Sequence, residues 1–414
     1  MLWLKFAWRN LWRNSLRTCI QLFAIAGGIF LTTFLANLQK GSWEKVVYDG
    51  VRSGSGHVGI YHEKYLTERK TEHVFQVEEL LKFLSSRESN NFVEAYFPRL
   101  YVPGLARSSH ESRSALILGL DIEKELLSNP ILDAKRLVSG ELPLKNKKEM
   151  ACIGAKLAMS LQVNVGNKIV IMFQDSTNNI VSKLFRISGI FRSNVSQFDN
   201  SFVLVDRESL AEAYGAPGTA HELALVSRTH TDEKPLLKYI SSGTVIPSAA
   251  RAFPWQEAMP QLHSAIKMDH FQLMLFLIIV YSVIGIGAIN TLLMSVMERT
   301  REFGLLRALG LNSENIRKVI IFEAMWLAFA GVGTGLFFSF FASLYTWYFG
   351  IDFTFLLGNL EVAGILIDPV IHGGWDFGTL IVMSSIMIVL VLSGSLYPAH
   401  RALKIKPAEA MRKF

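Results

Sequence analysis

The chain has 414 residues and a formal net charge of +7; 50% of its residues are hydrophobic and 19% are charged. Soluble domains average about 25% charged residues, so the composition argues against a cytosolic enzyme, a disordered protein and a fibrous protein. Two cysteines, Cys19 and Cys152, cannot form a disulfide framework. The apolar excess lies at the start and in the last third, whereas residues 40–270 resemble an ordinary soluble protein.

Residues 1–17 are basic and amphipathic. Trp8 and Trp12 fall four positions apart, on one face of a helix, and Arg9 and Arg13 follow them directly. Interfacial tryptophan beside arginine suits a helix that lies in the headgroup plane of a membrane. We therefore expect Trp8, Arg9, Trp12 and Arg13 to anchor a cytoplasmic amphipathic helix at the membrane surface.

Four apolar runs predict membrane-spanning helices, because a helix needs about 20 apolar residues to cross the hydrocarbon core. They cover residues 18–39, 271–297, 319–349 and 377–397. The first run follows arginines, as a signal peptide would, but it is longer than the roughly 7–15 apolar residues of such a peptide. We interpret it as a retained span.

Lysine and arginine cluster in the first 17 residues, in the link 298–318 and in the tail 398–414, whereas the loop 350–376 contains neither. Basic residues favour the cytoplasmic side. We expect both termini and the 298–318 link to be cytoplasmic, and residues 40–270 and 350–376 to lie outside. The net charge of +7 then indicates topology and contact with anionic lipid rather than nucleic acid.

Residues 40–270 predict an extracytoplasmic α+β domain. Alternating apolar residues bounded by turn residues indicate strands, and Asp206 is a candidate N-cap for a helix that ends at Gly215. The strands are expected at 57–61, 114–120, 167–173, 180–191, 201–205 and 222–227, with helices at 77–84, 206–215 and 235–241. We expect two subdomains, a strand-rich one (about 110–205) and one built from 45–105 and 206–260.

Motifs for enzymatic chemistry are missing. The chain has no phosphate-binding Gly-x-x-x-x-Gly-Lys-Ser/Thr, no His-Glu-x-x-His, no Cys/His cluster and no Gly-x-Ser-x-Gly. His57 and His62 are interpreted as surface residues, and His263 and His270 as polar residues at the membrane edge. We predict no catalytic residue, no metal and no cofactor in this chain.

The link 298–318 carries the most distinctive pattern. Read as a helix, it places Phe303, Leu306 and Gly310 on one stripe and Arg299 and Glu302 on a neighbouring one. Gly310 is a candidate helix stop, with Asn312 or Ser313 as the next N-cap. Such a segment suits docking into a groove of a soluble partner; a solvated helix on the membrane is the alternative.

Three segments resemble the FtsX-like/MacB-like family of ABC transporter permeases: "AWRNLWRNSLRT", "ERTREFGLLRALG" and "YPAHRALKIKPAEAMR". Within that family the outer segments 55–60, 139–141, 153–158 and 165–168 most resemble the lipoprotein-releasing (LolC/LolE-like) permeases. The resemblance implies a multi-pass protein of the bacterial inner membrane that forms a homo- or heterodimer. It also implies a separate pair of ABC ATPase subunits, which bind ATP and Mg, so the chain itself is not an enzyme. The residues implied to couple it to the ATPase are Glu298, Arg299, Arg301, Glu302, Phe303, Leu306, Arg307 and Gly310.

The same resemblance implies a lipoprotein or similar amphiphile as cargo, and a periplasmic carrier or adaptor as a further partner. The hairpin that recruits the carrier in one such permease is long, whereas here it turns within 175–179, which puts recruitment by this chain in doubt. The alternatives are a MacB-like efflux permease of an envelope-spanning exporter and an FtsX-like regulator of cell-wall hydrolases. A co-purifying tripartite partner would favour the first, and a cell-separation phenotype without cargo the second.

Two features of the spans remain. Gly27-Gly28, Gly285-x-Gly287 and Gly331-x-Gly333-x-Gly335 permit helices to approach closely. Glu323 is the one acidic residue within a span, near its cytoplasmic end, and an ion pair suits it better than a transport role.

Overall fold

A computed structural model describes residues 2–85, 91–126, 128–132, 136–143, 149–193, 195–228, 233–242, 246–357, 361–362, 365–366 and 369–403. Residues 404–414 of the expected tail lie outside the described residues. The chain divides into two compact units. The helical unit comprises Met1–Glu44, Lys267–Phe355 and Val370–Phe414, and the mixed unit comprises Lys45–Ile266 and Leu356–Pro369.

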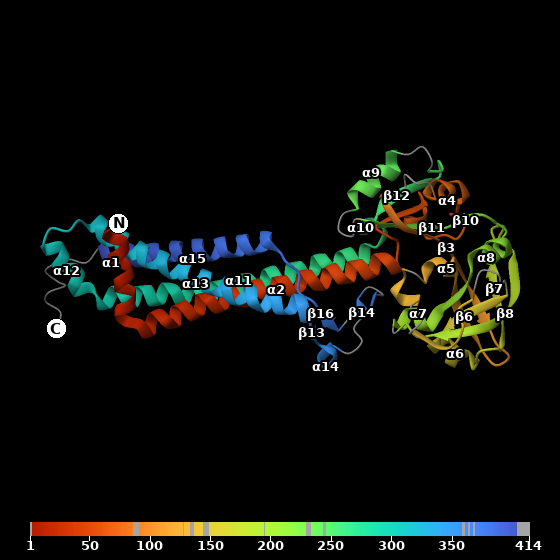
Figure 1. Cartoon of the computed structure of the whole chain (residues 1–414), viewed down its shortest axis with the longest axis horizontal. Coiled ribbons are helices and arrows are strands. Elements are labelled where there is room, and N and C mark those ends of the chain that lie inside the picture. Colours follow the sequence, from red (N-terminus) through yellow and green to blue (C-terminus); the bar gives the residue numbers. More distant parts are fainter. Residues whose placement is uncertain are drawn as a thin grey trace. The chain divides into compact units, whose positions relative to one another are not determined.

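Within the described residues, four helices are long and apolar enough to cross a membrane, as expected (Figure 1). They are α2 (Ser15–Ser53), α11 (Pro260–Glu298), α13 (Ser313–Phe349) and α15 (Phe377–Leu403). α2 and α11 extend well beyond the uncharged runs. In the polar part of α2, Lys40 pairs with Glu44 (3.9 Å) and Lys45 pairs with Asp49 (3.2 Å). The two residues of each ion pair lie one helical turn apart, so the pairs support the helix there.

Shorter elements precede α2, lie between α11 and α13, and occupy the segment between α13 and α15, whose residues 356–369 belong to the mixed unit. They are α1 (Leu2–Leu11), the 3-10 turn η1 (Trp12–Asn14), α12 (Thr300–Ala308), α14 (Thr354–Leu357) and the pairs β13 (Ile351–Asp352)–β16 (Val370–Ile371) and β14 (Glu361–Val362)–β15 (Ile365–Leu366). Figure 1 shows α1 and α12 at the same end of the helical unit.

Small residues and polar pairs join α2 to α13. A Cβ on Gly335 would stand 2.6 Å from the Ala26 carbonyl oxygen, so only glycine fits, whereas Gly333 has open space. Two buried hydrogen bonds follow along the same helices, Thr33 to Ser339 (2.7 Å) and Asn37 to Ser343 (2.9 Å). The close approach expected at the glycines thus exists at some positions and not at others. The space beside Gly28, Gly285 and Gly331 is occupied by side chains of other helices, whereas the space beside Gly27 and Gly287 is open.

The mixed unit is built on a ten-stranded sheet of order β12-β1-β11-β3-β4-β9-β6-β8-β5, with β7 paired to β3 and β8. The strands are β1 (Val58–His62), β3 (Val93–Arg107), β4 (Ser112–Leu120), β5 (Leu137–Gly140), β6 (Met150–Gly154), β7 (Lys168–Gln174), β8 (Ile180–Phe191), β9 (Phe202–Asp206), β11 (Glu222–Ser227) and β12 (Ala250–Pro254). A separate pair joins β2 (Phe75–Gln76) to β10 (Thr219–Ala220).

Helices cover parts of this sheet. They are α3 (Tyr65–Glu68), α4 (Glu78–Leu84), α5 (Ile122–Glu125), the 3-10 turn η3 (Pro130–Leu132), α6 (Ala155–Leu161), α7 (Ser196–Ser201), α8 (Arg207–Tyr214), α9 (Lys234–Ser242) and α10 (Trp255–Ala258). The Asp206 side chain accepts a hydrogen bond from the Ser209 amide and α8 ends at Gly215, in the left-handed region at φ +79°, as expected.

The two expected subdomains correspond to separate cores that share one long strand. One core contains Leu100, Ile117 and Phe185, and the other contains Ile60, Leu80 and Leu225. β3 runs through both cores, and its second half was not expected in the strand-rich core. The division at residue 206 is also corrected, because Leu210 on α8 packs in the strand-rich core.

Candidate functional site

The segment that follows α11 folds as predicted from its pattern. α12 spans Thr300–Ala308, Gly310 adopts φ +91°, and the side chain of Asn312, rather than Ser313, caps α13 by accepting from the Glu314 amide. A left-handed residue after a helix favours glycine, which has no Cβ to clash. The break at Gly310 therefore sets α12 off as a separate short helix between two spans.

Ion pairs join this segment to the N-terminal residues. Arg13 contacts Glu302 at 2.6 Å and Arg17 contacts Glu298 at 2.5 Å, each through both guanidinium nitrogens. The hydrogen bond from Arg13 lowers the pKa of Glu302. Both pairs are solvent-exposed in part, and bidentate geometry makes them stronger than ordinary surface pairs. The sequence placed Arg13 in the expected membrane anchor and Glu302 in the expected coupling segment, and the structure brings the two together.

Glu323 is buried and holds three segments. It accepts hydrogen bonds from Arg299 (2.9 Å) and from Asn10 (2.8 Å), and its side chain is 6% exposed. Arg299 also contacts Glu302 at 3.4 Å, the expected pairing three residues apart. Glu323 on α13 thus links α1 and the start of α12. The ion pair expected for Glu323 has Arg299 as its partner.

The apolar stripe of α12 faces a cluster formed with α13, and docking of the segment on a soluble partner stays a prediction. Phe303 is 2% exposed and packs with Ile316 and Ile320 of α13, and Leu306 is half-buried against the same cluster. Arg307 is half-buried and donates to the Leu403 carbonyl. The solvent-facing apolar residues of the segment are Leu305 and Leu309, which are 54% and 77% exposed. They share a face with the exposed Arg301, four residues earlier.

The residues expected to anchor the chain at a membrane surface lie on α1 and on the 3-10 turn that follows it. Trp8 and Trp12 are neighbours with ring centroids 5.9 Å apart and are 41% and 48% exposed, and Arg9 is exposed. Trp8 also stacks edge-on with Trp326 of α13 at 5.1 Å. Arg13 pairs with Glu302 rather than facing lipid headgroups alone. The role of these residues at a membrane surface remains a prediction.

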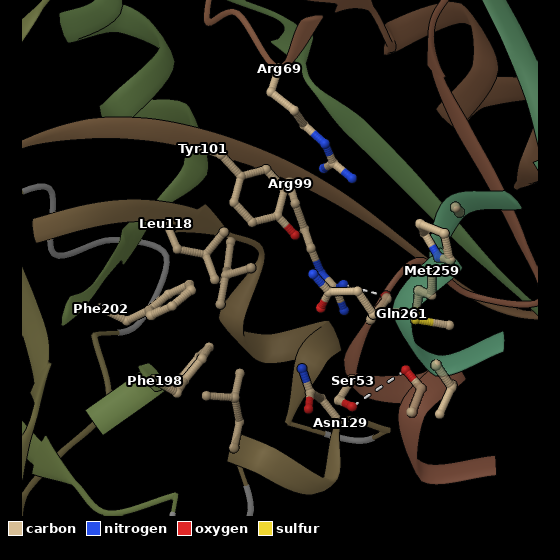
Figure 2. Close-up of a pocket in the computed structure, with 17 residues that line it drawn as sticks. Ser53, Arg69, Arg99, Tyr101, Leu118, Asn129, Phe198, Phe202, Met259 and Gln261 are labelled. Carbon is tan, nitrogen blue, oxygen red and sulfur yellow. Dashed lines mark hydrogen bonds between the residues drawn. The ribbon is translucent and has the colours of Figure 1, made fainter. Parts of the chain in front are cut away.

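The mixed unit contains a second candidate site, a pocket of about 340 Å³. Figure 2 shows Leu118, Phe198 and Phe202 on one side of it and Met259 and Gln261 on the other. A second cavity of about 450 Å³ shares Arg69, Tyr101 and Met259 with the first. Such volumes are typical of small-ligand sites.

A buried polar network forms the wall between the two cavities. Arg99 donates to both oxygens of Glu125 (2.5 and 3.0 Å) and to the Gly54 carbonyl, while the hydroxyls of Tyr61 and Tyr101 donate to Glu222 at 2.6 and 2.5 Å. Burial is the main cause that raises the pKa of both tyrosines. Each charge has partners, so the network orders the wall.

Beside this network lies His221, which is fully buried. It accepts from the Tyr101 amide and contacts the Thr71 carbonyl at 2.8 Å. Burial lowers its pKa to about 4, so the ring is neutral at neutral pH. Sequence reasoning did not identify this network; the one signal for it is Arg99, which stands between Pro98 and Leu100 in β3. Among the described residues, no group of three or more His, Cys, Asp or Glu side chains comes together that could hold a metal ion.

The described residues thus combine four helices apolar enough to cross a membrane, an inserted mixed unit and a short charged helix between two of the long helices. Residues 274–407 match the family model described as FtsX-like permease C-terminal. This part of the chain therefore carries an FtsX-like permease domain.

The chain is also similar to individual proteins of known name. The chain is similar to the lipoprotein-releasing system transmembrane protein LolC of Neisseria meningitidis (24% identical; 63% of this chain and 64% of that protein). It is similar to the macrolide export ATP-binding/permease protein MacB of Haemophilus ducreyi (23% identical; 98% of this chain and 55% of that protein). The solved periplasmic region of MacB from Actinobacillus actinomycetemcomitans aligns with 51% of this chain and 94% of that chain, at 12% identity and a TM-score of 0.36.

Proposed function

We propose that this chain is the permease subunit of an ABC transporter of the bacterial inner membrane, paired with a second permease and two separate ATPase subunits. Both termini and α12 face the cytoplasm, and the mixed unit lies outside. The relatives named LolC and MacB, the FtsX-like domain and the basic flanks of the spans support this. ATP and Mg bind in the ATPase subunits, and this chain transmits the motion of those subunits across the membrane.

The observation that carries the proposal is the exposed face of α12. Leu305 and Leu309 project from a short helix whose opposite face is fixed to the spans through Phe303 and whose end is tied to the N-terminal helix. Exposed leucines on a rigid, charged helix suit insertion into a groove of a partner. A push on this face would reach α1 and α13 through Arg13, Arg299 and Glu323.

Co-purification of the ATPase tests the docking. Leu305→Asp and Leu309→Asp should abolish recovery of the ATPase with the permease, whereas the matched Leu305→Met and Leu309→Met retain apolar volume and should leave it unchanged. Phe303→Asp is unsuited to this purpose because it would also disrupt the folded permease. Recovery of the intact complex with both aspartate variants would refute docking through this face.

The cargo we infer is a lipoprotein or similar amphiphile, extracted from the outer leaflet, with a periplasmic carrier or adaptor as the acceptor. The LolC relatives support it. Stimulation of ATP hydrolysis in the reconstituted complex by a purified lipoprotein is the expected result. The H. ducreyi MacB relative, which aligns with nearly the whole chain, favours macrolide-type efflux as the second candidate; stimulation by a macrolide and by no lipoprotein would establish that alternative.

A further inference from the structure

Part of one face of the sheet in the mixed unit carries exposed apolar side chains. In the register of β3, β4, β7 and β8, Pro103 pairs with Leu116, Leu105 with Met172, and Val170 with Leu184, so these side chains share a face. The opposite face, with Val102, Ile117 and Ile171, is buried in the strand-rich core. We call the first the open face. Leu105 and Leu184 are 46% and 48% exposed there.

The open face is continuous with both cavities. Pro103 and Leu116 line the second cavity, Tyr101 lines both, and Leu118, which pairs with Tyr101, lines the first beside Phe202. An apolar path therefore runs from the Phe198–Phe202 wall seen in Figure 2 out along the strands. Between Tyr101 and Arg107 the path is six residues, or about 20 Å, long.

The far end of the path is positively charged. The open face of the described strands, over 101–107, 112–118, 168–174 and 180–186, carries Arg107, Lys168 and Arg186 and no acidic residue. Lys168 pairs directly with Arg186, and Arg107 pairs with Val170, two positions from Lys168 on β7. All three are exposed. The apolar path thus ends at a cluster that complements an anionic group.

We propose that this path binds a single-chain amphiphile with an anionic head. The hydrocarbon chain lies along Leu105 and Pro103 into the cavities, and the head, a carboxylate or a phosphate, meets Arg107, Lys168 and Arg186. The cavities favour this occupant over a protein partner, because about 340 and 450 Å³ accommodate a hydrocarbon chain and not a folded surface. Only the role of the bound amphiphile as cargo rests on the proposed function. Its binding to the mixed unit is independent of the ATPase.

Photo-crosslinking of the full chain in nanodiscs tests the binding. The probe is a twelve-carbon fatty acid with a diazirine at the chain end, and adducts are mapped by mass spectrometry. Adducts on the membrane helices are the internal reference, since any hydrophobic probe partitions there. Adducts are expected also in peptides that contain Leu118 or Phe202. Adducts confined to the membrane helices would overturn the proposal.

Variants test which residues contact the hydrocarbon chain and which contact the anionic head group. Leu105→Asp should lower adduct yield in the mixed unit about tenfold, since each buried methylene contributes about fourfold to affinity. Met159→Asp, a 69% exposed side chain on α6, is the matched control and should change nothing. Arg107→Gln combined with Arg186→Gln should reduce capture of the acid while leaving the corresponding alcohol unaffected. Equal capture of acid and alcohol by the unmodified protein, or full yield in Leu105→Asp, would refute the assignment.

Competition identifies the source of the head. Dodecanoate and dodecyl phosphate should both displace the probe from the mixed unit, and the stronger competitor shows which head the cluster prefers. Inorganic phosphate alone should not compete, because it lacks the chain; competition by it would overturn the amphiphile in favour of a simple anion site. No ATPase is present, so failure of ATPase docking elsewhere leaves this result unaffected.

Discussion

Replacing Glu323 with alanine should destabilise the helical unit. The Arg299 side chain is 10% exposed and donates to Glu323 at 2.9 Å, so the variant leaves a buried guanidinium without its main acceptor. Removing one partner of a buried pair costs about 3–5 kcal/mol. Because Glu302 stands 3.4 Å from Arg299 and can still accept, we expect a cost of about 2–3 kcal/mol, below that range.

A double-mutant cycle separates the pair from its surroundings. Arg299→Met with Glu323→Leu removes both charges and should restore stability to within about 1 kcal/mol of the unmodified chain, because desolvation of the two charges offsets their attraction. The assay is the folded fraction that survives heating in nanodiscs of fixed composition, read by gel filtration. A neutral Glu323→Ala, or a double variant as damaged as the single one, would refute the reasoning.

Three further predictions concern helix packing, protonation and thiol exposure. Gly335→Ala should lower thermal stability, with a cost of about 1–3 kcal/mol for overpacking against Ala26, whereas Gly333→Ala should not; equal effects would contradict the packing. His221 takes up a proton near pH 6.5 in the unfolded chain but only near pH 4 in the folded chain. The free energy of unfolding should therefore fall as the pH drops between these values, by up to about 1.4 kcal/mol per pH unit. His221→Gln should remove that slope, and an unchanged slope would show that this histidine is not its cause. In a Cys19→Ser background, Cys152, whose pKa burial raises to about 12, should react with maleimide only after unfolding; labelling of the native chain would contradict its burial.

The sequence predicted the four long helices because uncharged apolar runs are a direct signal of membrane helices. It did not predict that α2 continues to Ser53, because the uncharged run ends at Leu38; beyond it the helix is supported by paired charges and by the buried Val46 and Val51. β3 was not predicted, since Pro98, Pro103 and Gly104 interrupt a strand pattern.

The candidate site was predicted as a set of residues but not as an arrangement. Helical periodicity placed Phe303 and Leu306 on one stripe, but periodicity does not state which neighbour covers a stripe, and here α13 does. The partners Arg13 and Glu302 are separated by 289 positions, so no local pattern joins them. Arg99 and Glu222 similarly meet only because β3 and β11 are neighbours in the sheet.

The two hydrogen bonds between α2 and α13 have the same spacing on both helices. Thr33 and Asn37 are four residues apart, as are Ser339 and Ser343, so the helices run in the same direction with matching repeats. A shift of one or two ångströms along the axis would break both bonds and take these partners from the buried hydroxyls of Ser339 and Ser343. The next register that satisfies any of them is a full turn away, about 5.4 Å. Motion along this pair must therefore proceed in discrete turns, or α2 and α13 must travel together as one rod.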